Sequence, residues 1–297
     1  MALADLLSAA ISAEHSGPKP RDDELDLFGV THIGKVRKEN QDHFLICTMH
    51  QQLVIHGTSF PDPGKLAVRG ERLATFMLVA DGVGGAAGGG EASQLTVQTI
   101  ARYVSSTMRG FEAVGSQREE QLLDSLRAAA REAHGAVRAE AAARGEPRMA
   151  TTLTLCIAVW PRAYVMQVGD SRCYYYVNGT LRRLTRDQTI AQELVDQGVL
   201  PADRASNSPF SHVLVRAIGS DEATPEVTAL DLSWGCVFLL CSDGLTKHVS
   251  DADLLEELQH MKSSEQLCRS LVELALARGG TDNITVLVGR PRDRKSV

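Results

Sequence analysis

Five aspartates of this sequence stand beside short apolar runs, each next to small or turn-forming residues. They are Asp42, Asp81, Asp170, Asp243 and Asp282. Because the neighbouring runs are typical of β-strands, the five side chains could meet at one rim of a core without being buried inside it. Converging carboxylates with no lysine or arginine immediately beside them repel one another, and a hard divalent cation relieves that repulsion. The pattern predicts a site of oxygen ligands that binds Mg²⁺, Mn²⁺ or Ca²⁺ in preference to zinc.

A glycine-rich segment follows the second of these aspartates, over residues 82–90. Gly82 has no Cβ, so its backbone carbonyl could approach a cation held by Asp81. The segment could instead be a phosphate cradle that opens a helix, but it has neither the Gly-Lys-Ser/Thr ending of a P-loop nor the Gly-x-Gly-x-x-Gly spacing of a dinucleotide fold. A nucleotide site is therefore disfavoured. Each aspartate taken alone could also do no more than cap a helix or shape a turn.

Arg37 lies five residues before Asp42. Its planar guanidinium could hold two phosphate oxygens, although most arginines are simply solvated at the surface. A nucleophilic triad is not supported, because Ser171 lies in Gly-Asp-Ser-Arg and not in Gly-x-Ser-x-Gly. His43 adjoins Asp42, and on a strand it would point to the opposite face. The sequence therefore offers no convincing nucleophile.

The elements that must position these residues are short strands and longer helices. Strands are predicted at residues 44–47, 76–80, 152–159, 163–168, 173–177 and 237–241, at 284–288, and from 181 after the hairpin-type turn Asn178-Gly179. Helices are predicted at residues 91–108, 117–143, 251–260 and 264–278, the last two preceded by capping-box patterns at Ser250 and Ser263. Consecutive strands, two long central helices and a terminal helix pair favour an α+β fold of packed antiparallel sheets over a doubly wound parallel fold.

Composition restricts the classes of partner. With 43% apolar and 23% charged residues among 297, the chain has the composition of a globular protein. The net charge of −6 argues against general binding to nucleic acid or to an anionic membrane. Six cysteines form no CxxC pair, and we expect reduced core residues of a cytoplasmic protein. No apolar run approaches the roughly 20 residues of a membrane span.

Eight motifs occur in a fixed order. They are Thr31-x-x-Gly34-x-x-Arg37-x-x-Asn40-Gln41-Asp42, Val79-Ala80-Asp81-Gly82-Val83-Gly84-Gly85, Ala150-Thr151-Thr152-Leu153, Val168-Gly169-Asp170-Ser171-Arg172, Leu184-Thr185-Arg186-Asp187, Ala217-Ile218-Gly219, Leu240-Cys241-Ser242-Asp243-Gly244-Leu245 and Gly280-Thr281-Asp282-Asn283-Ile284-Thr285. This set, which covers about residues 27–290, resembles the metal-dependent serine/threonine protein phosphatases of the type 2C family, particularly their bacterial branch. Each motif alone is weak, but their joint order is highly specific.

The resemblance implies a central antiparallel β-sandwich flanked by helix pairs, in four layers αββα, with two Mn²⁺ or Mg²⁺ ions at one edge and a third, weaker site. Its implied ligands are Asp81 bridging both ions, the Gly82 carbonyl on one of them, Asp243 and Asp282 on the first ion, Asp170 with Asp243 at the third site, and Gln41 and Asp42 in the outer shell. Arg37 would bind the substrate phosphate, and residues 189–215 would form a flap beside the site.

The implied activity is hydrolysis of phosphoserine and phosphothreonine in proteins by a water or hydroxide that bridges the metals, opposing a serine/threonine kinase. Two departures stand out: Val83 replaces a histidine of eukaryotic relatives, and Gln188 replaces a histidine common after Leu-Thr-x-Asp. A catalytically silent phospho-binding or scaffold protein, and a small-molecule phosphatase, remain alternatives. We expect a monomer with an N-terminal extension over residues 1–26, a catalytic domain over 27–292, an insertion at 58–72 and a tail at 293–297.

Overall fold

The structure is a computed structural model that describes residues 17–52, 69–83, 88–107, 116–205 and 208–292. Its centre is a pair of five-stranded sheets in which all neighbouring strands are antiparallel. The first sheet has the order β2 (Asp42–Gln52), β3 (Arg69–Asp81), β4 (Leu153–Val159), β5 (Arg162–Val168) and β8 (Glu226–Asp231). The second has the order β1 (Leu25–His32), β10 (Ile284–Pro291), β9 (Val237–Cys241), β6 (Arg172–Val177) and β7 (Thr180–Arg183).

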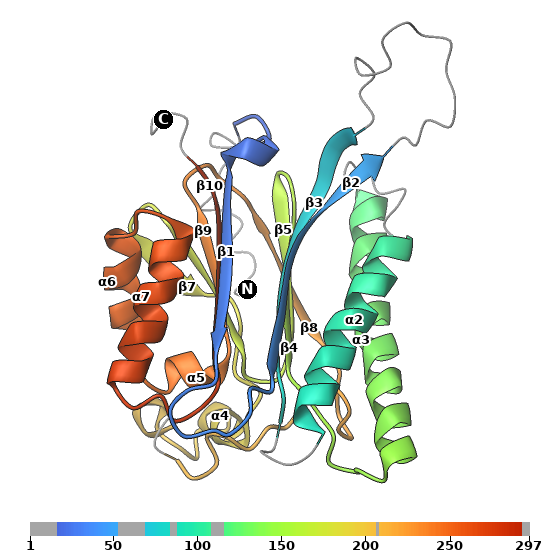
Figure 1. Ribbon diagram of the computed structural model, residues 1–297, viewed down its shortest axis with the longest axis vertical. Helices are drawn as coiled ribbons and strands as arrows, with labels where there is room; N and C mark the ends of the chain where they lie inside the picture. Colours follow the sequence, from blue (N-terminus) through green and yellow to red (C-terminus); the bar gives the residue numbers. More distant parts are fainter. Residues whose placement is uncertain (1–16, 53–68, 84–87, 108–115, 206–207, 293–297) are drawn as a thin grey trace, which may run out of the picture.

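A helix pair covers the outer face of each sheet (Figure 1). The long helices α2 (Gly89–Thr107) and α3 (Ser116–Arg144) pack on the first sheet, and α6 (Asp251–Gln259) and α7 (Ser264–Ala277) pack on the second. Shorter elements are α4 (Ile190–Asp196), α5 (Asp243–Thr246) and the 3₁₀ turns η1 (Asp22–Glu24) and η4 (Ala202–Arg204). This arrangement confirms the predicted four-layer αββα sandwich. None of the described helices combines the length and apolar character needed to cross a membrane.

Three apolar layers hold these four layers together. On β3, Phe76 and Leu78 face α2 and α3, whereas Met77 and Val79 face the second sheet. Successive side chains of a strand point to opposite faces, so a strand covered on both sides is apolar at every position. This explains the unbroken apolar run at the end of β3. The third layer joins α6 and α7 to the outer face of the second sheet.

The predicted turn and one predicted cap are confirmed in full. Asn178 (φ 50°) and Gly179 (φ 76°) form the two-residue turn between β6 and β7. At α6, the Ser250 side chain accepts from the Asp253 backbone N–H, and the Asp253 side chain accepts in return from the Ser250 N–H. At α7 only half of the box forms: Ser263 accepts from the Gln266 N–H at 3.1 Å, but the Gln266 side chain accepts from Lys262.

The N-terminal extension predicted over residues 1–26 includes described residues that are part of the fold. Residues 25 and 26 belong to β1, and residues 17–20 are hydrogen-bonded to the body of the fold. Trp160 Nε1 donates to the Gly17 carbonyl at 3.2 Å, and Trp234 Nε1 donates to the Pro18 carbonyl at 2.9 Å. These partners are distant in sequence, so the local proline and glycine content gave no sign of them. Residues 1–16 and the tail at 293–297 lie outside the described residues.

Other expectations need smaller corrections. The insertion predicted at 58–72 ends earlier, because residues 69–72 pair with β2 as the start of β3; residues 58–68 lie outside the described residues. The flap predicted at 189–215 contains α4 and η4 and so is partly helical. All six cysteines, which fall within the described ranges, are free thiols, but Cys47 is exposed and only the other five are buried.

Candidate metal centre

The antiparallel topology brings the five aspartates to one end of both sheets. Asp42 begins β2 and is the register partner of Asp81, which ends β3. Asp170 lies in the turn from β5 to β6, Asp243 begins α5 just after β9, and Asp282 precedes β10 by two residues. Since strands β3, β5 and β9 end where β2, β6 and β10 begin, these loops share the edge near α4 and α5 (Figure 1).

Asp42 connects the two sheets at this edge. Its Oδ2 atom accepts hydrogen bonds from Ser242 Oγ and Thr285 Oγ1, both at 2.7 Å; Thr285 lies in β10 of the second sheet, and Ser242 directly follows β9 of that sheet. Its Oδ1 atom is buried and has no hydrogen-bond partner among the described residues. Burial raises the pKa of Asp42 to about 6, and the charge of Asp243 adds to that rise, against the two hydroxyl donors.

Asp81 is fixed through its backbone. Its N–H donates to Thr152 Oγ1 at 3.0 Å, and its carbonyl accepts from the Thr152 N–H at 2.9 Å and from Thr151 Oγ1 at 2.8 Å. The Ala-Thr-Thr motif therefore acts as a clamp on the end of β3. Desolvation raises the pKa of Asp81 well above its usual range, and the charges of neighbouring carboxylates, Asp42 first, raise it further.

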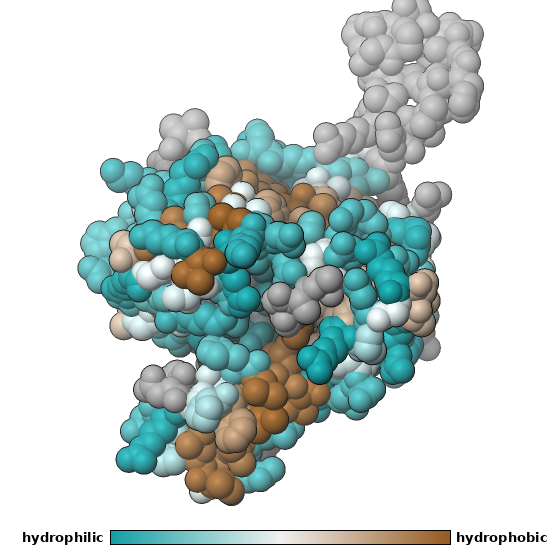
Figure 2. Space-filling view, turned by 60° about the horizontal axis from the view of Figure 1, so that its bottom comes forward, coloured by the Kyte–Doolittle hydropathy of each residue, from teal (hydrophilic) through white to brown (hydrophobic). Residues whose placement is uncertain are grey.

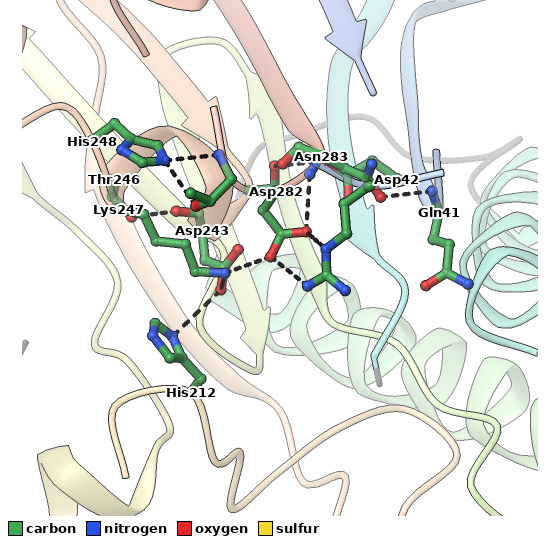
Figure 3. A network of polar contacts seen from close by, with 12 residues as sticks. Gln41, Asp42, His212, Asp243, Thr246, Lys247, His248, Asp282 and Asn283 are labelled. Carbon is green, nitrogen blue, oxygen red and sulfur yellow. Dashed lines mark hydrogen bonds and ion pairs between the residues drawn. The ribbon is translucent and has the colours of Figure 1, made fainter. Parts of the chain in front are cut away.

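Asp282 and Asp243 share a lysine on the other side of the site (Figure 3). Lys247 Nζ lies 2.6 Å from Oδ2 of both carboxylates. Arg37 also holds Asp282 in a bidentate pair, with its Nε and Nη2 atoms at 2.6 and 2.8 Å. Desolvation alone would raise the pKa of Asp282, but the hydrogen bonds from Arg37 and Lys247 outweigh it and lower this pKa to about 2. Desolvation would lower the pKa of Lys247, but the two carboxylates raise it overall.

The remaining predicted residues lie around this centre. Asp170 is buried, and desolvation followed by the charge of Asp243 raises its pKa well above the usual range. Gln41 contributes its backbone: its N–H donates to Asn283 Oδ1 at 2.9 Å and its carbonyl accepts from the Gly82 N–H at 3.2 Å. The Gln41 amide points away from Asp282 (Figure 3).

The donor set fits a hard dication. Every ligand candidate offers oxygen, one buried carboxylate oxygen of Asp42 has no donor, and mutual repulsion raises the pKa of Asp81. Gly82 is packed so closely that a Cβ there would lie 2.5 Å from the Gly89 backbone. In the part of the chain that the structure describes, however, no three acidic, histidine or cysteine side chains are arranged to hold one ion. The carboxylates of Asp243 and Asp282 are instead turned onto cationic side chains.

Sequence comparison decides the family. A model of the protein phosphatase 2C family matches residues 62–278. The chain belongs to this family. It is 37% identical to the serine/threonine protein phosphatase PstP of Mycobacterium tuberculosis over 72% of its own length, and it spans 40% of that relative. It is 30% identical to the serine/threonine phosphatase stp of Listeria welshimeri, again over 72% of its length and over 83% of the relative.

Solved structures of phosphatases 2C agree with this assignment. The crystal structure of the M. tuberculosis phosphatase PstP/Ppp gives a TM-score of 0.73 at 30% identity, covering 91% of this chain and 99% of the other. The catalytic domain of PstP in complex with two manganese ions gives a TM-score of 0.69 at 29% identity, with the same coverage. The predicted resemblance and fold are thereby confirmed.

Several residues of this phosphatase 2C site were not predicted from the sequence. Lys247 is four residues after Asp243, a spacing at which side chains meet on a helix, so the signal was present. Ser242 and Thr285 lie within two of the eight motifs, but no local signal links them to Asp42, because their bonds to it span 200 and 243 residues of chain. Asn283 likewise holds the loop before Asp42 by donating to the carbonyl oxygens of residues 33 and 39, both at 2.9 Å.

Gly244 fixes the spacing between the loops of Asp243 and Asp282. A Cβ at this position would overlap the backbone carbonyl oxygen of Asn283. We expect Gly244→Ala to lower the free energy of unfolding by about 1–3 kcal/mol, as overpacking does. Gly135→Ala is the control: it lies inside α3 with nothing within 4 Å of the added Cβ, and should raise that free energy by about 0.5–1 kcal/mol. Urea unfolding of both variants tests this, and equal stabilities would contradict it.

Proposed function

We propose that this chain is a metal-dependent phosphatase that hydrolyses phosphoserine and phosphothreonine in proteins. The observation that carries the proposal is the convergence of Asp42, Asp81 and Asp170 around Asp243 in a member of the protein phosphatase 2C family; burial first, and the charge of Asp243 in addition, raise the pKa values of the other three. Relatives named as serine/threonine phosphatases, one of them solved with two manganese ions, support the same chemistry.

The residues present divide the work as follows. Asp81, Asp243, Asp282 and the Gly82 carbonyl would hold two Mn²⁺ or Mg²⁺ ions, Asp170 with Asp243 would hold a third, and Asp42 and Gln41 would act in the outer shell. Bound ions of this kind lower the pKa of water for attack on phosphorus and offset the charge that builds on the phosphoryl oxygens. Asp42 fixes this end of the two sheets against each other through Ser242 and Thr285.

Arg37 binds the phosphate of the substrate. It already presents its Nε and Nη2 atoms together to two carboxylate oxygens of Asp282, which is the geometry that also suits two phosphate oxygens. Its side chain is 42% exposed and borders a cleft of about 860 Å³, so it can turn from Asp282 toward a ligand. The Arg37 guanidinium therefore positions the phosphate next to the carboxylates.

The surroundings of the cleft suit a polypeptide better than a small metabolite. Apolar surface gathers in a band among hydrophilic side chains on the face seen in Figure 2. Among the described residues, the exposed large apolar side chains include Phe210 and Val213 of the flap. They flank His212, whose Nδ1 atom lies 4.0 Å from Asp243 Oδ2. Apolar groups beside the charged site offer contacts to residues that neighbour the phosphorylated one. The proposed substrates are thus phosphorylated proteins. We further propose that the enzyme is cytoplasmic and monomeric and opposes a serine/threonine kinase.

Metal removal tests this function. Hydrolysis of p-nitrophenyl phosphate and of phosphoserine and phosphothreonine peptides should require Mn²⁺ or Mg²⁺, disappear with EDTA and return when Mn²⁺ is added in excess. Free phosphorylated metabolites should be hydrolysed more slowly than the peptides. Activity that persists in EDTA would overturn the mechanism, absence of any activity would favour a silent phospho-binding protein, and a preference for metabolites would exclude the protein substrate class.

A further inference from the structure

Lys247 lies between two of the carboxylates proposed as metal ligands. Its Nζ atom is 2.6 Å from Oδ2 of Asp243 and 2.6 Å from Oδ2 of Asp282. All three side chains are largely shielded, with 20%, 18% and 16% of their surface exposed. A close and shielded pair of this kind is screened much less by salt than a surface ion pair. The ammonium is therefore a strong local counter-charge for both carboxylates.

The same two carboxylates are the ones assigned above to the first metal. A dication between them would compete with Lys247 for the Oδ2 atoms and with Arg37 for Asp282, and the ammonium and the dication would repel each other in that space. We propose that the Lys247 ammonium is a built-in competitor for the first metal, so that this ion binds only by displacing the lysine. The inference rests on the proposed function, because it takes the pair Asp243 and Asp282 as metal ligands.

The local structure allows the displacement. Lys247 caps the C-terminal end of the one-turn helix α5, which begins at Asp243. Its four-carbon stem is flexible and its ammonium is strongly hydrated once released. The side chain lines the cleft of about 860 Å³, which is open to water. Lys247 can thus leave the carboxylates without any change in the sheets. The competition by Lys247 weakens the affinity for the first metal, since part of the binding free energy goes into breaking its two ion pairs.

His212 provides an internal comparison. Its Nδ1 atom faces the same Oδ2 atom of Asp243, but at 4.0 Å and with 60% of the side chain exposed. A longer and more exposed contact is screened by solvent and contributes little. If proximity to Asp243 were enough to compete with the metal, His212 and Lys247 would act alike. Of these two residues, the geometry predicts that only Lys247 competes with the metal.

Calorimetric titration of metal-free protein with Mn²⁺ tests the inference. Lys247→Met should bind Mn²⁺ at least about tenfold more tightly than wild type, because the two Lys247 ion pairs no longer have to be broken while the Arg37–Asp282 pair is the same in both proteins. The Mn²⁺ affinity of Lys247→Arg, which keeps the charge, should stay close to that of wild type. His212→Asn and Lys38→Met, the latter removing an exposed lysine, should leave the affinity unchanged. Metal-free Lys247→Met should also melt at a lower temperature than metal-free wild type, because Asp243 and Asp282 lose their shared counter-charge.

The outcomes separate the two proposals. Wild-type protein that binds no Mn²⁺ at all would overturn the proposed function. If wild type binds Mn²⁺ and Lys247→Met binds it equally or more weakly, the competitor role is wrong while the function stands. Lys247→Gln serves as a second neutral variant should Lys247→Met fail to fold, and its Mn²⁺ affinity is judged by the same criterion.

Discussion

Asp81→Asn is expected to lower kcat/KM for a phosphopeptide by more than about 10³-fold, well beyond the roughly 10–100-fold lost with an outer partner of a metal ligand. Asparagine has nearly the same size and offers one carbonyl oxygen, but it has no negative charge and cannot bridge two ions through a carboxylate. The backbone clamp of Thr151 and Thr152 on this position stays intact, since it uses only the main chain of residue 81. Calorimetry should show that both principal ions are lost.

Folding of this variant is a separate readout. Because desolvation and the neighbouring carboxylates raise the pKa of Asp81, removing its charge relieves repulsion in the metal-free protein. Metal-free Asp81→Asn should therefore be at least as stable as metal-free wild type in a urea titration. Asp221→Asn, a fully exposed aspartate, is the control and should retain activity and metal affinity. An active Asp81→Asn enzyme with two bound ions would refute the bridging role.

Arg37→Ala is expected to reduce kcat/KM by about 10–100-fold, mainly through a higher KM, because hydrogen bonds to a charged group are worth about 1.5–3 kcal/mol. The variant should bind the substrate more weakly, but its affinity for Mn²⁺ should not decrease, since Asp282 loses only a cation that competes with the metal. Inorganic phosphate should inhibit the variant less strongly than wild type.

Arg37→Lys is the matched variant for this prediction. It keeps the positive charge but cannot form two parallel hydrogen bonds, so its KM should lie between those of wild type and Arg37→Ala. Steady-state kinetics at saturating Mn²⁺ measure the series. A loss of Mn²⁺ affinity in Arg37→Ala with unchanged KM would show that the arginine supports the metal centre and does not bind phosphate.

Most of the fold was accessible from sequence because this sandwich has covered sheets and amphipathic helices. Strands buried on both faces, such as β3 to β5, read as continuous apolar runs. The edge strand β8 escaped prediction because most of its residues are exposed and its sequence is polar at both ends. Strand β1 was also missed, since Asp26 and Gly29 interrupt its apolar pattern. Asp26 is buried there because Ser264 and Arg290 bind it, which no local pattern shows.

The site was predictable to a similar degree. Carboxylates next to strand ends mark the edge where they gather, and the order of the motifs identifies the family. The counter-charges of Asp282 were not predictable from neighbouring residues, since Arg37 lies 245 residues and Lys247 lies 35 residues away from it in the chain. The orientation of side chains within the site depends on such distant pairs. Only the structure shows that Lys247 and Arg37 both donate to Asp282.

The bonds from Asp42 to Ser242 and Thr285 have a consequence for ion selectivity. Asp42 and Asp81 belong to one sheet, while Asp243 follows β9 and Asp282 precedes β10 of the other sheet. We expect the spacing between the two groups of oxygens to depend on the thickness of the apolar layer between the sheets, to which Met77 and Leu240 contribute. Mg²⁺ demands shorter and more regular oxygen distances than larger cations do. We therefore expect discrimination between ions by radius to depend partly on methionine and leucine side chains that are not among the proposed ligands.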